Sequence, residues 1–256
     1  MPQWLNPIGR IFYAAGLIGI GIQHWIFADF IPVMIPFWPS WIPGRAFWVY
    51  ALGAALIGAG AAILFGIQAR RVAAILGAAI LVLVVIDDIP ARLIANPGNL
   101  AAWTNSFKAL TMGGGAWMVA LSLSHAKSPL TQRLEALMPV GRFFLPITVI
   151  VFGIDHFIYT VFVASLVPSW IPGSYFWTYF AGVALIAAGV GIILKILERW
   201  AALLLGVMIF LWLIMLHIPR AIADPHTGKG NEWTSVCEAL AFSGIAFLLA
   251  VRSAAH

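Results

Sequence analysis

The sequence Pro-Ser-Trp-Ile-Pro-Gly at residues 39–44 decides the fold, because it occurs a second time at residues 168–173. The residues around it recur in the same order. His24 precedes the first copy, His156 precedes the second, and the pattern Phe-Trp-x-Tyr follows both. A repeat of about 130 residues is far longer than a solenoid unit. The chain is therefore interpreted as two fused, related modules.

Composition indicates that these modules lie in a lipid bilayer. Hydrophobic residues make up 62% of the chain and charged residues 9%, whereas about 25% of a soluble domain is charged. Eight apolar runs are long enough to cross ~30 Å of hydrocarbon as helices. The sequence thus predicts an all-α polytopic membrane protein with eight transmembrane helices, at about 8–29, 46–67, 71–90, 106–123, 142–163, 175–196, 200–219 and 235–252.

An even number of spans in each half means that both halves enter the membrane from the same side. We therefore expect two parallel-repeat four-helix bundles, related by a pseudo-two-fold axis along the membrane normal. The expected units are a first four-helix repeat at residues 1–124, a polar cytoplasmic linker at 125–139 and a second four-helix repeat at 140–256.

The net charge of +5 would suggest a nucleic-acid partner in a soluble protein. Here the basic residues sort by membrane side and lie mostly in short loops, so we expect no nucleic acid. Nine are expected on the side of the termini and five on the other, which predicts that both termini are cytoplasmic. The nine are Arg10, Arg70, Arg71, Lys127, Arg133, Arg142, Lys195, Arg199 and Arg252, and the five are Arg45, Arg92, Lys108, Arg220 and Lys229.

The two proline-rich segments are expected to cap the face opposite the termini. Their prolines disfavour helix, their glycine permits a turn and their tryptophan suits a membrane interface. They are either plain interfacial loops or lids over a site. Elsewhere, the single cysteine, Cys237, excludes an internal disulfide.

Ionisable residues inside the spans are energetically costly and are therefore candidates for function. We expect them at one depth, near the face opposite the termini. The candidate catalytic residues are His24, His156, Asp88, His217 and Asp155. A membrane histidine can equally be a hydrogen-bond partner between helices, and that alternative stays open.

Other polar and aromatic residues are expected around the same site. Lys108 and Glu238 occupy equivalent positions with opposite charge, so they are able to pair across the interface between the halves. Asp88 and Arg92 are able to form a neutralising ion pair. The candidate cofactor-binding residues are Trp103, Trp233, Arg92, Arg220, Lys108 and Glu238.

Two differences between the halves bear on the number of sites. The first half has Asp88 where the second has His217, and Gln23 where the second has Asp155. These differences indicate either one composite site or one retained and one drifted site. We favour a single dominant site.

The chain resembles the DoxX-like family of small bacterial membrane proteins. The resemblance depends on Gly153-x-x-His156-Phe157, Val167-Pro168-x-x-Ile171-Pro172-Gly173, Tyr179-x-x-Gly182 and a basic turn at Arg199, and it covers both halves. Family members often carry an acidic residue where this chain has Ala55 and Ala184. The resemblance implies a polytopic protein of the bacterial inner membrane, with links to sulfur or quinone redox chemistry.

Three functions are compatible with these residues. The first is a quinone-linked oxidoreductase or its membrane subunit, with His24 or His156 donating to a quinone headgroup. Four tryptophans would line its apolar slot: Trp103, Trp233, Trp48 and Trp177. The second is non-catalytic binding or transport of a small lipophilic molecule. The third, a metal or haem site, lacks the tight ligand spacing of a metal motif, so we expect no metal. A homo-oligomer or a redox partner remains open.

Overall fold

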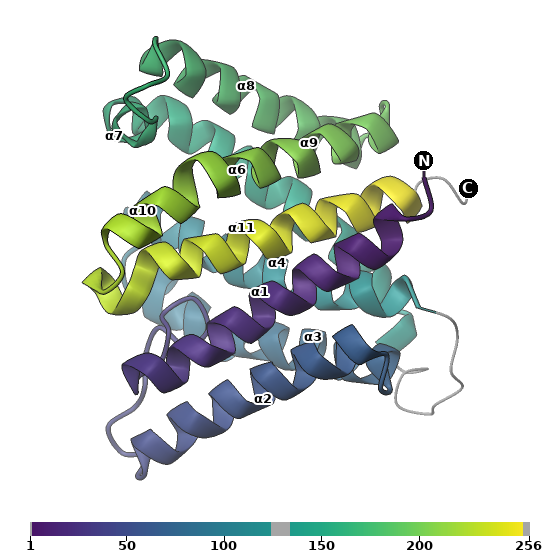
Figure 1. The fold of residues 1–256 in the computed structure, drawn as a ribbon. Helices are drawn as coiled ribbons and strands as arrows, with labels where there is room; N and C mark the ends of the chain where they lie inside the picture. The colour runs from purple at the N-terminus through teal and green to yellow at the C-terminus, as the bar shows by residue number, and fades with distance from the viewer. Residues whose placement is uncertain (1, 124–133, 253–256) are drawn as a thin grey trace.

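The computed structural model describes residues 2–123 and 134–252, and within them it contains helices and no strands (Figure 1). Seven helical segments of this part are long and apolar enough to cross a membrane: Leu5–Phe27, Arg45–Phe65, Ala69–Ile94, Met138–Ile158, Ser174–Ile193, Glu198–Ala223 and Thr227–Arg252. For the described residues, the prediction of an all-α protein with helices able to cross a membrane is therefore confirmed.

The sequence repeat divides the helices into two sets, here called the first and the second half. The first half consists of α1 (Leu5–Phe27), α2 (Arg45–Phe65), α3 (Ala69–Leu83), the π-helix η1 (Val84–Ile94) and α4 (Leu100–Leu121). The second half consists of the 3-10 helix η2 (Met138–Phe143), α6 (Phe144–Ile158), α7 (Thr160–Leu166), α8 (Ser174–Ile193), α9 (Glu198–Trp212), the π-helix η3 (Leu213–His217), α10 (Ile218–Ala223) and α11 (Thr227–Arg252).

Helix α4 is the predicted span that is missing from the seven. Its first turns carry Thr104, Asn105 and Lys108, which lower its hydropathy. Its second part is buried inside the protein, with Met112 and Ala116 fully enclosed. A helix surrounded by other helices needs little lipid-facing surface, so its lower hydropathy fits its place in the fold.

Helices α4 and α11 lie side by side in the centre of the molecule, with α1 against α11 and α6 against α4 (Figure 1). Glycines permit the closest approaches. A Cβ atom added to Gly21 in α1 would lie 2.8 Å from the Gly53 carbonyl oxygen in α2, and one added to Gly153 in α6 would lie 2.8 Å from the Gly182 oxygen in α8. The two halves thus use the same small-residue seams.

The proline-rich segments end at glycines that start the next helices. Gly44 has a φ of 71° and Gly173 a φ of 75°, a left-handed conformation that glycine adopts without steric cost. The tryptophans of these segments face outward, with Trp41 80% and Trp170 69% exposed. This exposure suits residues at a membrane interface.

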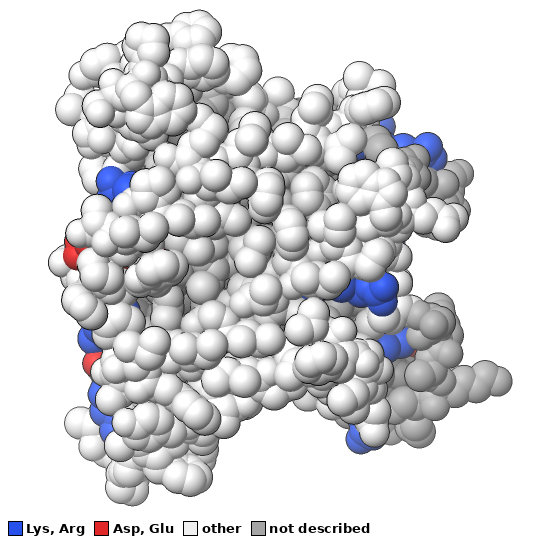
Figure 2. Space-filling view, viewed as in Figure 1, with Lys and Arg blue, Asp and Glu red and all other residues white. Residues whose placement is uncertain are grey.

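Charged residues gather at the two ends of the bundle (Figure 2). The N- and C-termini share one end (Figure 1), and we call the opposite end the distal end. Seven of the nine acidic residues of the chain lie toward the distal end, in loops or in the distal part of a helix: Asp29, Asp87, Asp88, Asp155, Asp224, Glu232 and Glu238. Carboxylates are therefore concentrated away from the termini.

The expected linker is only partly visible, because residues 124–133 lie outside the described ranges. Glu135, within the described part of the linker, forms an ion pair of 2.7 Å with Arg70. Arg70 is buried and also donates to the Ala120 and Leu123 carbonyl oxygens, each at 2.9 Å. The end of the linker is thereby fixed to the first half.

Candidate functional site

The centre of the distal end is an ion pair between the two halves. Lys108 Nζ of α4 lies 2.9 Å from Glu238 Oε2 of α11, and the Glu238 side chain is only 5% exposed. Glu238 Oε1 is buried without a hydrogen-bond partner in the part of the chain that the structure describes. The pairing expected from the sequence therefore forms, and it joins the two central helices.

A hydrogen bond from a threonine recurs on both sides of this ion pair. Thr104 of α4 donates to Asp155 Oδ2 of α6 at 2.6 Å, and Thr234 of α11 donates to Gln23 Oε1 of α1 at 2.8 Å. Asp155 and Gln23 thus make the same contact, since each accepts a hydrogen bond from a threonine hydroxyl of the other half. Their difference in charge leaves this contact intact.

Asp88 is held within the first half by two partners. It accepts a hydrogen bond from Ser106, and its Oδ2 lies 3.6 Å from Arg92 Nε. Arg92 also donates to the carbonyl oxygen of Pro32. The neutralising pair considered from the sequence is therefore present, in a π-helix that contains Pro90.

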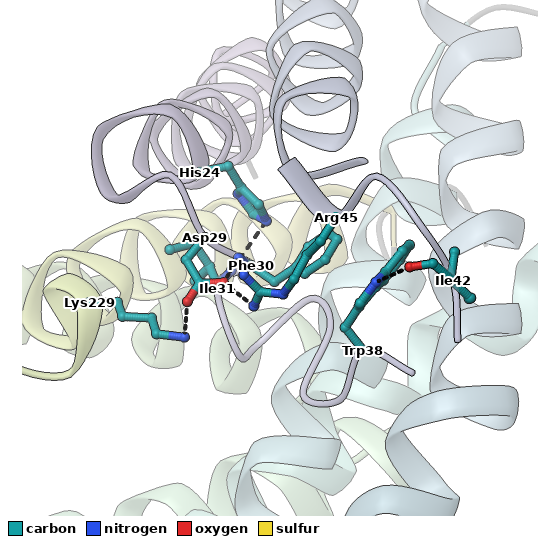
Figure 3. A network of polar contacts seen from close by, with 8 residues as sticks. All are labelled: His24, Asp29, Phe30, Ile31, Trp38, Ile42, Arg45 and Lys229. Atoms are coloured by element: carbon teal, nitrogen blue, oxygen red, sulfur yellow. Dashed lines mark hydrogen bonds and ion pairs between the residues drawn. The ribbon is translucent and has the colours of Figure 1, made fainter. Parts of the chain in front are cut away.

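His24 is fully enclosed and uses both ring nitrogens. Its Nδ1 lies 2.8 Å from the Ile20 carbonyl oxygen, and its Nε2 accepts the backbone N–H of Ile31 at 3.3 Å. Ile31 belongs to the loop after α1, which folds back toward the ring (Figure 3). In the first half, the histidine is thus saturated by its own chain.

The segment that covers His24, residues 30–34, is here called the plug. Its apolar side chains are buried: Phe30 is 3%, Ile31 0%, Val33 5% and Met34 6% exposed. Pro32 and Pro36 stand in and just after it. Proline removes a backbone donor and breaks helices, so this stretch folds inward as a loop.

The corresponding segment of the second half takes a different course. From His156 to Pro168 the chain is three residues shorter than from His24 to Pro39, and it contains no proline in between. It forms the helix α7, whose Val161 is 73% and Phe162 63% exposed. The second half therefore has no plug.

His156 is consequently only partly covered. Its Nδ1 lies 2.7 Å from the Phe152 carbonyl oxygen, and its ring stacks on Trp212 at 6.0 Å between centroids. No hydrogen bond to its Nε2 is seen within residues 2–123 and 134–252. Five residues beyond Trp212, about one π-helical turn, His217 has a buried Nδ1 that also has no partner in these ranges.

We call Asp155, His156, Trp212 and His217 the His156 site. Trp212 was not anticipated from the sequence. Its position opposite the histidine could have been found only from the way α9 packs, because the first half has Leu83 at the corresponding place.

Other predicted site residues lie apart from the His156 site or are already paired. Arg220 makes two hydrogen bonds to Glu232, at 3.0 and 2.6 Å. Trp103 donates to the Pro97 carbonyl oxygen at 2.9 Å. Trp233 is 36% exposed, so it faces the surroundings. Of the other two tryptophans predicted to line an apolar slot, Trp48 is 47% and Trp177 44% exposed.

Two further features of the surface were considered as sites. No three His, Cys, Asp or Glu side chains of the described residues come together as metal ligands. A shallow hollow lined by Lys195, Leu197, Glu198, Arg199 and Trp200 lies at the turn between α8 and α9. This turn is at the end of the termini, away from the clustered ionisable groups, so we place no site there.

An ion-pair cluster on Asp29 was missed by sequence reasoning. Asp29, in the loop after α1, pairs with Arg45 at the start of α2 and with Lys229 at the start of α11 (Figure 3). Lys229 has a φ of 60° between two glycines of positive φ. The cluster ties the loop that carries the plug to the second half. The only available signal was that Asp29 is the single acidic residue of that loop.

This cluster should make stability depend on acid. Burial alone would raise the pKa of the Asp29 carboxyl, but hydrogen bonds from Lys229 and Arg45 outweigh it and lower the pKa below its ordinary value. Because the pKa of Asp29 is lower in the folded state, its ionised carboxylate stabilises the fold at pH values above the ordinary pKa of about 3.9. This stabilisation is lost as the pH falls through the folded-state pKa. We expect Asp29→Asn to be less stable than the wild type at pH 7 and the difference to shrink as the pH falls below the ordinary pKa of about 3.9. Detergent unfolding above and below this pKa measures the difference, and a constant difference would contradict it.

Comparisons with known proteins concern mainly the second half. Residues 145–248 match a family described as a domain of unknown function, DUF8561. The match runs from α6 into α11 and thus includes all four residues of the His156 site. Neither a curated protein nor a solved structure matches the chain.

Proposed function

We propose that the chain is an eight-span protein of the bacterial inner membrane, built from two parallel four-helix repeats like those of the DoxX-like family. The helix contacts support this arrangement, because α1 packs on α2 and α11 as α6 packs on α8 and α4. A pseudo-two-fold axis between α4 and α11 would exchange these pairs. The excess of arginine and lysine at the end of the termini supports cytoplasmic termini.

Within this protein, we propose that the second half binds a small lipophilic molecule at the His156 site. The observation that carries the proposal is the contrast between the two histidines. His24 is enclosed and has both nitrogens bonded, whereas His156 is half-buried with Nε2 open. Polar atoms inside a protein are nearly always satisfied, so the open Nε2 of His156 favours an external partner. The orphaned Nδ1 of His217, five residues beyond Trp212, is a second nitrogen unsatisfied among the described residues, on the helix that stacks on His156.

A quinone is the first candidate for this molecule. It combines an apolar tail, which suits entry from lipid beside the exposed Val161 and Phe162, with a polar headgroup that suits a histidine. Histidine exchanges protons near neutral pH, and Asp155 is adjacent to it. These residues suit a quinone-linked oxidoreductase or its membrane subunit acting with a redox partner. Binding or transport without chemistry uses the same contacts, and a test for turnover separates the two.

The matched variants His156→Phe and His24→Phe test the location of the site. Phenylalanine at 156 keeps a ring against Trp212 but removes both nitrogens, so we expect binding of the ligand form that hydrogen-bonds to Nε2 to weaken by about tenfold, equivalent to one good hydrogen bond. His24→Phe should change binding less than about twofold, because that ring is already saturated. Titration calorimetry with decylubiquinone and decylubiquinol in lipid nanodiscs measures both.

The opposite result identifies a different site. If His24→Phe weakens binding while His156→Phe leaves it unchanged, the ligand occupies the first half and the plug must open to admit it. If the folded wild type binds neither compound, the quinone assignment fails.

A further inference from the structure

We propose that the His156 site recognises a hydroxyl donor, so that it binds a quinol in preference to the corresponding quinone. The inference rests on the proposed function and specifies which form of the ligand the site accepts. It follows from the direction of the hydrogen bonds around the two histidines.

The position of the ring proton is set by the helix backbone. His156 Nδ1 lies 2.7 Å from the Phe152 carbonyl oxygen. A carbonyl oxygen only accepts hydrogen bonds, so Nδ1 must carry a proton and donate it. In a neutral imidazole the other nitrogen is then an acceptor. His156 Nε2 is therefore ready to accept a proton donor and has no proton to offer a quinone carbonyl.

The first half already contains an occupant of the required kind. His24 repeats the contact, with Nδ1 2.8 Å from the Ile20 carbonyl oxygen. Its Nε2 accepts the backbone N–H of Ile31, which the plug presents among buried apolar side chains. The plug thus shows the kind of group that this histidine binds, namely a hydrogen-bond donor that is surrounded by apolar groups.

The second half does not supply such a donor from α7. Val163 is seven residues after His156, as Ile31 is seven after His24, and its N–H donates within its own helix to the Tyr159 carbonyl oxygen at 2.9 Å. The Thr160 hydroxyl lies 2.9 Å from the His156 carbonyl oxygen and 2.8 Å from that of Phe157. These two donors are therefore bonded to backbone carbonyl oxygens, which leaves Nε2 for a ligand.

Among quinone-type molecules, this requirement separates the two oxidation states. A quinone headgroup presents carbonyl and ether oxygens, which only accept. A quinol presents two hydroxyl groups, which donate. A quinone would place an acceptor oxygen against the acceptor Nε2, which is unfavourable. A quinol instead forms an O–H···N hydrogen bond with Nε2. The acceptor role of His156 reverses the direction expected from the sequence, in which the histidine donates to a quinone.

Three ligands that differ only at the headgroup oxygens provide the test. Decylubiquinol, decylubiquinone and the dimethyl ether of decylubiquinol are titrated anaerobically into nanodiscs that contain wild-type protein. We expect the quinol to bind about tenfold more tightly than the other two. With His156→Phe, the three affinities should become equal within about twofold, since only the open nitrogen distinguishes the ligands.

The outcomes separate this inference from the proposed function. Equal binding of all three ligands to the wild type, weakened equally by His156→Phe, would keep the site but overturn the donor preference. If His156→Phe still binds the quinol more tightly than the other two ligands, the inference is also overturned, because another group would then accept the hydrogen bond from the hydroxyl. Failure of every ligand to bind folded wild-type protein would instead overturn the proposed function.

Discussion

Lys108→Met should lower the free energy of unfolding by about 3 kcal/mol, because it leaves Glu238 unpaired between the two central helices. The Glu238 side chain is 5% exposed and its second oxygen already has no partner among the described residues. Lys108 is itself 23% exposed, which keeps the expected loss at the lower end for a broken buried pair. Equilibrium unfolding by a denaturing detergent in mixed micelles measures the change.

The double variant Lys108→Met/Glu238→Met is the matched control. It removes both charges and replaces them with apolar side chains, so it should recover most of the lost stability. If the single variant is as stable as the wild type, or if the double variant is no more stable than the single one, then the ion pair does not hold the halves together.

His24→Ala should destabilise the protein by about 2 to 4 kcal/mol, whereas His156→Ala should cost about 1 kcal/mol. His24 is fully enclosed and bonds both to its own helix and to the plug, so its removal creates a cavity and orphans the Ile31 N–H. His156 loses one hydrogen bond and its stacking on Trp212. The same unfolding assay compares the two variants.

The comparison also separates a structural histidine from a binding one. If His24 is structural, its variant should unfold at lower detergent concentration than the wild type but bind the ligand normally. If His156 binds the ligand, its variant should stay stable but lose binding. Equal losses of stability at both positions would contradict the difference between the halves.

Much of the fold could be predicted from sequence because its signals are local and repeated. The second span was expected at 46–67 and is α2 at Arg45–Phe65, and the sixth was expected at 175–196 and is α8 at Ser174–Ile193. Long apolar runs form helices in lipid whatever their neighbours do. The pairing of Lys108 with Glu238 was also predictable, since the two residues occupy equivalent positions of the sequence repeat with opposite charge.

The difference between the two loops could not be derived in the same way. Residues 30–34 and α7 are equally apolar, so hydropathy does not tell which one folds inward. The signal was present in Pro32 and Pro36, which exclude a helix in the first half. The identical Pro-Ser-Trp-Ile-Pro-Gly segments that follow predict similar loops and give no sign of this difference.

Charge differences were also a poor guide to function. The pair Gln23 and Asp155 suggested a change of role, but both accept a threonine hydroxyl from the other half. Sequence distance hides this equivalence, since Thr234 lies 211 residues from Gln23. A hydrogen bond between elements so far apart is fixed by helix packing and leaves no local pattern.

The central claim is that only the second half has an open site. The most direct test of this claim is photo-crosslinking with a quinol that carries a diazirine beside its headgroup. After irradiation in nanodiscs and mass spectrometry, labelled residues should lie in α6, α9 or η3 near His156 and Trp212, and excess decylubiquinol or His156→Phe should abolish the label. Competed labelling of α1 around His24 or of the plug, or equal labelling of both halves, would contradict the claim.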